Sequence, residues 1–448
     1  MHRNNLFRFG TLLKQKMREE IPKLKERVKT LQKSSDKVVD QIDVGSIIGG
    51  MRELPVMFYI GSQLCPKEGI RFRGLSIPEM QQQLPKINRE PLPEAVLWLL
   101  LVGRAPTDNE LRDIKTSMIK NQPLPDSTIN LIKQLAPSHH PMTMLSMAIL
   151  DLQKQSVFAK EYSLGKLKKA DYWERTLDDG LLLLNQLPDV AALIYTTKYG
   201  KKAQKVTEND WAGRYAQLMG YNSEKLNEVL RGYLSIHSDH EGGNVSGHTS
   251  YLVNSALSDP FLSVSAAING LAGPLHGLAN QEVLKFLLAL RDHLRAINVP
   301  ITSSEDPLVL SSISAFASNW LKTGVIPGYG HGKLRSTDPR FTHLKHQAKA
   351  IMPEKELVKI VHACESVIPD ILKALGKVKN PNPNVDAHSG VLLYELGLTE
   401  FDYYTVIFGV SRAIGCVANM VWARALGLPL ERPGSLDLEK LEQFVRDN

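Results

Sequence analysis

The sequence predicts a mainly α-helical protein with, at most, small hairpins near the N-terminus. Apolar residues step by four and three between charged residues from Met17 to Leu31, and again from Val283 to Ile297, as in a helix with one buried face. Most of the remaining chain reads as helices joined by short turns that contain proline or glycine. Strand signals are few, so helices should carry the architecture.

The N-terminal elements follow from local residues. Pro22 lies inside the first apolar stripe, so we expect a kink there or a division into two helices. The alternation at Ile42 and Val44 and the stretch 57–73 are the best strand candidates. The eight consecutive apolar residues 95–102 indicate a core helix, because a membrane span needs roughly 18–20.

Two later segments should interrupt the helices. Residues 298–306, which contain Pro300 and two adjacent serines, indicate a surface loop. Residues 380–384 alternate asparagine and proline, and proline restricts the residue before it to extended backbone, so a rigid, non-helical turn is predicted.

Composition limits the possible functions. The 448 residues are 43% hydrophobic and 23% charged, which is typical of a folded globular protein of one large domain or roughly two to three smaller ones. The net charge of +7 suits small anionic substrates, and no dense run of lysine and arginine predicts nucleic-acid binding. No membrane span is expected.

Cysteine usage and the N-terminus bear on the compartment. Three scattered cysteines without a C-x-x-C motif argue against a disulfide framework or a thiolate zinc site, and we expect them to be buried in a reducing environment. Residues 1–10 contain Arg3 and Arg8 but no acidic residue, which faintly resembles a mitochondrial presequence; a disordered basic tail explains these residues equally well.

Glycine, histidine and charged residues are concentrated in four blocks, where a plain helical core would not place them. The blocks are residues 237–248, 273–280, 327–340 and 384–390. A metal-dependent hydrolase built on His237, His240 and His248 is one reading, but the order H-x-x-H-E differs from the zinc motif H-E-x-x-H. Histidines that tie down a helix end are a simpler explanation of the first block.

Two other chemistries fit the blocks less well. The glycines at 328, 330 and 332 match neither of the nucleotide-binding motifs G-x-G-x-x-G and G-x-x-x-x-G-K-[ST]. A simpler explanation is that they let the backbone bend tightly at His331. Ser389 lacks the G-x-S-x-G context of a nucleophilic serine.

Acid–base chemistry remains. A carboxylate in a dry pocket can remove a proton from a carbon beside a thioester, imidazole N–H groups can stabilise the enolate oxygen, and arginines can grip carboxylates bidentately. The chain offers Asp386, two histidines and several arginines for these roles, a coherent set but not a unique one. Taken alone, Asp386 could cap a helix and His276 could be a satisfied core histidine.

The blocks together resemble the citrate synthase family, nearest to its eukaryotic mitochondrial type. The matching text includes HSDHEGGNVSGHTS, NGLAGPLHGLANQEVL, PGYGHGKLRSTDPRF, NPNVDAHSGVLL, VIFGVSRAIG and ALGLPLERP, in this order over nearly the whole chain. The resemblance implies a metal-free enzyme without a cofactor that condenses acetyl-CoA with oxaloacetate and hydrolyses citryl-CoA, as the first step of the tricarboxylic acid cycle. It also implies a homodimer in the mitochondrial matrix.

The resemblance also implies a role for each matching residue. Asp386 corresponds to the base on the acetyl-CoA methyl, His276 to the donor to the thioester oxygen, and His331 to the donor that polarises the oxaloacetate carbonyl. Further residues correspond to oxaloacetate contacts, with the last expected to come from a partner subunit: His240, Arg340, Arg412 and Arg432.

Basic residues should hold the CoA phosphates. Arg52 and Arg335 stand at matching places, whereas a further family arginine falls near Lys168, where this chain has lysine and a one-residue length difference. The resemblance implies an all-α fold with a large domain, residues 1–276 and 392–448, and a smaller one, residues 277–391. A 2-methylcitrate synthase, which uses propionyl-CoA on the same scaffold, and a non-catalytic CoA-binding protein remain alternatives.

Overall fold

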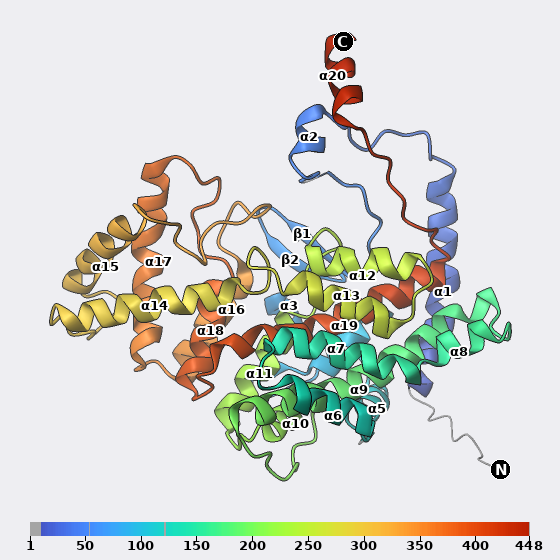
Figure 1. The fold of residues 1–448 in the computed structure, drawn as a ribbon, viewed down its shortest axis with the longest axis horizontal. Coiled ribbons are helices and arrows are strands. Elements are labelled where there is room, and N and C mark those ends of the chain that lie inside the picture. The colour runs from blue at the N-terminus through green and yellow to red at the C-terminus, as the bar shows by residue number, and fades with distance from the viewer. Residues whose placement is uncertain (1–9, 53, 121, 448) are drawn as a thin grey trace.

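Long buried helices form the centre of the fold in the computed structural model, which describes residues 10–447 apart from 53 and 121 (Figure 1). Helix α19 (Tyr404–Leu426) packs against α9 (Tyr172–Tyr199), α12 (Val245–Ser255) and α13 (Pro260–Leu271). Around them lie α7 (Pro141–Leu152) and α4 (Pro93–Val102). The predicted helical fold class is therefore confirmed.

The apolar run 95–102 forms most of α4, and all ten residues of that helix are buried, as predicted. The other helices of this body are α5 (Asp108–Ile119), α6 (Asp126–Leu135), α8 (Val157–Ser163), α10 (Trp211–Leu218) and α11 (Glu224–Ile236), with short 3-10 helices at Gln153–Gln155, Lys169–Asp171 and Phe401–Tyr403.

The helical stretch Phe401–Leu426 is long and apolar enough to cross a membrane by length and composition, and its most apolar window is entirely buried inside the protein. It is therefore a core helix. Arg412 interrupts its apolar sequence, and its side chain is 1% exposed.

Helix α1 (Thr11–Gln32) is continuous through Pro22, so the alternative of two helices is wrong. Pro22 is exposed, and the carbonyl four residues earlier, which loses its helical partner, can bond water instead. The predicted apolar stripe is buried only in the first half of the helix, at Met17 and Ile21, whereas Leu31 is 64% exposed.

The strand candidates divide into one correct prediction and one error. Strands β1 (Ser62–Cys65), β2 (Gly69–Phe72) and β3 (Leu75–Ser76) form an antiparallel sheet, of which the first two lie within the predicted stretch 57–73. The Ile42 and Val44 prediction is wrong, because Val44 begins helix α2 (Val44–Ile48). The carboxylate of Asp43 accepts a hydrogen bond from the Ser46 N–H at 2.6 Å and caps that helix.

The second half of the chain contributes a separate group of helices at one end of the molecule (Figure 1). Helices α14 (Ala279–Ala296), α15 (Pro307–Trp320) and α17 (Glu356–Leu375) pack on one another. Helices α16 (Pro339–Ile351) and α18 (Asp386–Glu395) also contact α11 and so join this group to the central body. The predicted breaks at 298–306 and 380–384 are both free of helix.

Helix α3 (Ile77–Gln83) and the small hairpin of β4 (Lys86–Ile87) and β5 (Glu90–Pro91) complete the N-terminal half. In contrast, α2 and α20 (Leu438–Asp447) stand away from the helical body (Figure 1). Neither helix has a buried residue, and both expose large apolar side chains, for example Ile48 at 73% and Leu438 at 67%.

Of the three cysteines, Cys364 and Cys416 are buried as expected, and Cys65 is partly exposed. The basic N-terminal segment interpreted as a possible presequence lies, except for Gly10, outside the described residues.

Candidate active site

Four segments that are distant in sequence carry the three predicted catalytic residues and His240, a predicted oxaloacetate contact. His240 follows α11, His276 lies in the turn between α13 and α14, His331 lies in the loop before α16, and Asp386 begins α18. The rings of His240 and His331 are 5.6 Å apart. The positive charge of Arg340 lowers the pKa of all three histidines and opposes the rise in the pKa of Asp386, so all four side chains lie within electrostatic range of this guanidinium.

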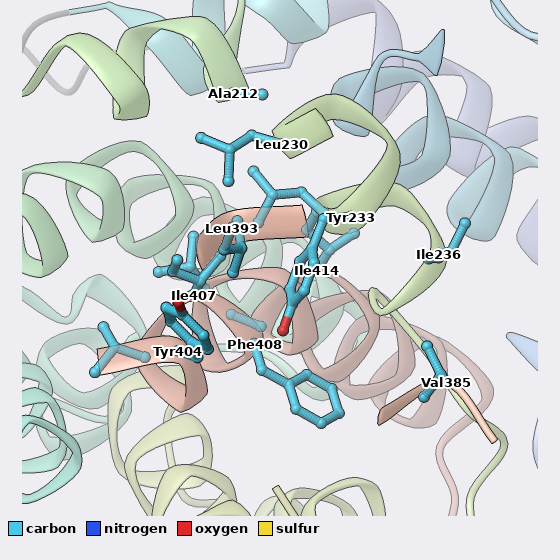
Figure 2. Close-up of a cluster of buried hydrophobic side chains, with 14 of the residues drawn as sticks. Ala212, Leu230, Tyr233, Ile236, Val385, Leu393, Tyr404, Ile407, Phe408 and Ile414 are labelled. Carbon is cyan, nitrogen blue, oxygen red and sulfur yellow. The ribbon is translucent and has the colours of Figure 1, made fainter. Parts of the chain in front are cut away.

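An apolar cluster contacts these polar groups through the Phe408 ring. Tyr233 of α11 and Phe408 of α19 lie within it, together with Ile236, Ile407 and Ile414 (Figure 2). The Phe408 ring contacts the His276 ring at 6.2 Å, and the Arg412 guanidinium lies over it at 5.1 Å. Because this cluster is apolar, it strengthens the electrostatic interactions of the polar groups that it contacts.

The contacts of His276 define which ring nitrogen carries its proton. Its Nε2 atom accepts a hydrogen bond from the Ser246 N–H at 3.3 Å and lies 3.0 Å from the Ser246 hydroxyl. Burial, reinforced by the charges of Arg412 and Arg340, lowers the pKa of His276 to about 3. A neutral imidazole that accepts at Nε2 carries its hydrogen on Nδ1, so His276 can donate from Nδ1.

His331 is oriented in the opposite sense. Its Nδ1 atom accepts from the backbone N–H groups of Lys333 and Leu334, both at 3.0 Å. Burial and then the charge of Arg340 lower its pKa to about 4, so the ring is neutral at physiological pH. Its hydrogen therefore sits on Nε2, and the ring can donate from that atom.

In this cluster, Nε2 of His240 and Nη2 of Arg412 are buried and have no hydrogen-bond partner among the described residues. The rest of the Arg412 guanidinium is fixed, since Nε donates to the His237 carbonyl at 3.2 Å and Nη1 to the Asn244 side chain at 2.8 Å. A buried cation with a free N–H group is costly unless an anion binds there. The arrangement therefore fits a small carboxylate ligand.

Arg340 is the second buried cation, and its side chain is 5% exposed. Asp338 caps α16 through the Arg340 backbone N–H and also accepts from the guanidinium, with Nη2 to Oδ2 at 2.6 Å. This ion pair fixes the guanidinium beside the histidines.

Asp386 is the first residue of α18. Its backbone N–H donates to the Asn384 side chain at 3.0 Å, and the N-cap position is taken by Val385, so the helix-cap alternative is wrong. Burial raises the pKa of Asp386 to about 7, the charge of Arg340 opposes this rise, and the charge of Asp338 adds to it. A carboxylate with a pKa near the working pH is suited to general-base catalysis.

Two of the three histidines of the metal-hydrolase alternative, His237 and His248, are held by separate partners. The Nδ1 atom of His237 bonds the Tyr233 carbonyl at 2.9 Å and its ring stacks on Tyr233, which matches the prediction of a histidine that ties down a helix end. Nε2 of His248 lies 2.6 Å from Glu431. Within the described residues, no three His, Cys, Asp or Glu side chains are arranged to hold a metal ion.

The remaining predicted residues lie outside this cluster. Arg432 is exposed in the segment after α19, and Arg52 and Lys168 are exposed elsewhere. Arg335 lies at the rim, in the His331 loop, where Nη1 donates to the Gly332 and Leu334 carbonyls at 3.0 Å.

Sequence reasoning missed the residues that orient the catalytic groups, Ser246 and Asn244. Both lie in the first histidine block, and Asn244 also caps α12. The sequence shows that Ser246 and Asn244 are polar and lie near the histidines of this block. It does not show that Ser246 contacts His276, and only that contact identifies the His276 tautomer.

The chain is similar in sequence to known citrate synthases. The family model described as "Citrate synthase, C-terminal domain" matches residues 50–434. The mitochondrial citrate synthase of Tetrahymena thermophila is 48% identical over 449 residues, covering 98% of this chain and 95% of the relative. That of Daucus carota is 46% identical over 441 residues, covering 97% and 91%.

Solved structures share the fold. Citrate synthase from Pyrobaculum aerophilum superposes with a TM-score of 0.72 at 25% identity, covering 90% of this chain and 95% of that one. The citrate synthase from Thermoplasma acidophilum, solved as a ternary complex with carboxymethyl coenzyme A and oxaloacetate, has a TM-score of 0.72 at 21% identity, covering 89% of this chain and 97% of that one.

Proposed function

This chain belongs to the citrate synthase family, and from that membership we propose how its residues condense acetyl-CoA with oxaloacetate and hydrolyse the resulting citryl-CoA to citrate and CoA. The observation that carries the assignment is the pair of unpartnered buried donors, on His240 and Arg412, beside two neutral imidazoles and a carboxylate of raised pKa.

The first step forms an enolate. Asp386 removes a proton from the methyl group of acetyl-CoA, and the Nδ1–H of His276 donates to the thioester oxygen as negative charge develops there. Because the pKa of His276 is lowered to about 3, its imidazole is neutral when it donates, and it stabilises the charge by a hydrogen bond.

The second step forms the carbon–carbon bond. The Nε2–H of His331 polarises the oxaloacetate carbonyl and transfers its proton as the enolate carbon attacks. The product is citryl-CoA, and attack of water on its thioester releases citrate and CoA. These steps use side chains alone, with CoA as a substrate and no cofactor.

Oxaloacetate is held by two cations and a neutral imidazole. Arg412, Arg340 and His240 bind its carboxylate and carbonyl oxygens, and Arg432 reaches the same site from the partner subunit of a homodimer. Exposure of Arg432 and of the apolar residues on α2 and α20 in the single chain supports this arrangement. Arg52 and Arg335 bind the CoA phosphates, and their exposure suits a highly charged ligand.

Domain movement completes the site. Residues 277–391 form a small domain that closes on the large domain of residues 1–276 and 392–448 when oxaloacetate binds, which excludes water before acetyl-CoA reacts. The separate packing of α14, α15 and α17 supports this division. The mitochondrial relatives support a location in the matrix.

A thiol-release assay tests the function. Purified protein with oxaloacetate should release CoA rapidly from acetyl-CoA and much more slowly from propionyl-CoA, with full activity in excess chelator. Faster release from propionyl-CoA would identify a 2-methylcitrate synthase, and loss of activity in chelator would restore the metal alternative. No release from either thioester would contradict the proposal.

A further inference from the structure

An ion pair joins the two loops that carry His240 and His331. Nζ of Lys333 lies 2.7 Å from Oε2 of Glu241, and the two side chains are 32% and 23% exposed. Glu241 directly follows His240, and Lys333 is two residues beyond His331. The pair therefore spans the same gap as the two imidazole rings.

The loop that carries His331 depends on such external contacts. Residues 327–338 contain no helix, and Gly328 and Gly330 adopt positive φ values of 82° and 93°, a conformation that glycine adopts easily. Within this loop, Lys333 is connected at both ends: its backbone N–H donates to His331 Nδ1, and its ammonium group binds Glu241. A displacement of Lys333 therefore also displaces the imidazole.

Glu241 is held in an unusual conformation. Its φ is 51°, in the left-handed region that a residue with a side chain seldom adopts. The Glu241 N–H donates to the Ser62 hydroxyl at 2.7 Å, and the Asn244 side chain donates to its carbonyl at 2.7 Å. These bonds hold the Glu241 backbone on both sides of the side chain, so the carboxylate that binds the lysine starts from a fixed point.

We propose that Lys333 and Glu241 act as positioning residues for the condensation, forming a latch that holds the Nε2–H of His331 toward oxaloacetate bound beside His240. This inference rests on the proposed function, because it assigns the latch to a step of that reaction. Neither residue contacts the reacting atoms; both act through the imidazole.

The test is a double-mutant cycle with a charge reversal. Lys333→Met and Glu241→Gln each remove the ion pair, and the double variant removes both charges together. Lys333→Arg keeps the positive charge, and the combination Lys333→Glu with Glu241→Lys restores an inverted pair. Lys345→Met is the matched control, since Lys345 forms an ion pair of similar burial with Glu365 that does not involve this loop.

Kinetics should separate positioning from binding of CoA. Each single variant should lower kcat by about two- to fivefold, in the range expected for a partly exposed ion pair, with KM for acetyl-CoA unchanged. The double variant should be no worse than either single one, and Lys333→Arg and the reversed pair should recover activity. A rise in KM for acetyl-CoA alone, or additive losses in the double variant, would overturn the latch.

Hydrogen exchange gives a readout that does not depend on turnover. The amides of Lys333 and Leu334, which bond His331, should exchange faster in both single variants than in the parent protein and the control. Unchanged exchange and kcat in an active enzyme would overturn the latch and leave the function intact. An inactive parent protein would instead contradict the function, while exchange would still report on the latch.

Discussion

The carboxylate of Asp386 illustrates how a single residue serves catalysis at the expense of stability. Its pKa is raised from 3.8 to about 7, so the folded protein disfavours the ionised form that the reaction needs. The unfolded chain ionises this group from about pH 4 upward. The contribution of Asp386 to the free energy of unfolding should therefore fall as the pH rises from about 4 to about 7 and remain level above that range.

Asp386→Asn should separate these two effects. The variant should lose turnover on the order of a thousandfold, because the base is absent, while oxaloacetate still binds. At pH 8 it should be more stable than the parent protein by on the order of 1–3 kcal/mol, and the difference should vanish near pH 4. Thermal unfolding at both pH values, with calorimetric oxaloacetate titration, measures this; near-normal turnover would refute the base assignment.

Arg412→Lys should weaken oxaloacetate binding by on the order of 2–3 kcal/mol, because an ammonium cannot keep the protein bonds of Nε and Nη1 and also present the Nη2 donors to a carboxylate. The measurement is the KM for oxaloacetate, with acetyl-CoA saturating. Arg291→Lys, at a partly exposed arginine paired with Asp292, is the control and should leave that KM unchanged.

At the scale of elements, α19 sets the position of the segment before His240. The Gly415 N–H donates to the Ser238 carbonyl at 3.0 Å, and a Cβ atom at Gly415 would lie only 2.4 Å from that oxygen. The two segments can touch only because this position has no side chain.

Gly415→Ala should therefore destabilise the fold by about 1–3 kcal/mol, as overpacking does, and also weaken oxaloacetate binding by shifting His240. Denaturant unfolding and the KM for oxaloacetate check the two effects. Gly324→Ala is the matched control, because a Cβ atom there meets nothing within 4 Å. Equal effects of both substitutions would contradict the proposed role of this close approach.

Elements with strong local signals were predictable from the sequence. The apolar run of α4, the proline-rich turn 380–384 and the histidine blocks all follow from residue type and spacing. The helix at Val44 was missed because the side chain of Asp43 caps it, a local bond that outweighs the alternating pattern. The proton positions on His276 and His331 depend on Ser246 and on backbone N–H groups that only tertiary structure brings close.

At the scale of the whole molecule, Arg432 lies outside the cluster formed by its own chain, which leads to a complementation prediction. Asp386→Asn and Arg432→Ala should each be nearly inactive alone. In a hybrid dimer, one site would combine the intact Asp386 of one subunit with the intact Arg432 of the other. Co-expression with random pairing should therefore restore about a quarter of the parent activity.

Recovery should follow the fraction of hybrid dimers separated by their affinity tags. Co-expression of Asp386→Asn with His276→Ala is the control and should restore nothing, since both residues belong to the same chain's site. Absence of recovery with confirmed hybrids would show that Arg432 does not act across subunits.

The position of α19 along the chain has a consequence for biosynthesis. Its partners α9, α12 and α13 all emerge from the ribosome before residues 404–426 do. Until α19 is synthesised, the apolar faces that it will cover remain exposed to solvent, and the incomplete chain is prone to aggregation. Helper proteins that bind nascent apolar segments should therefore engage this polypeptide until its translation is nearly finished.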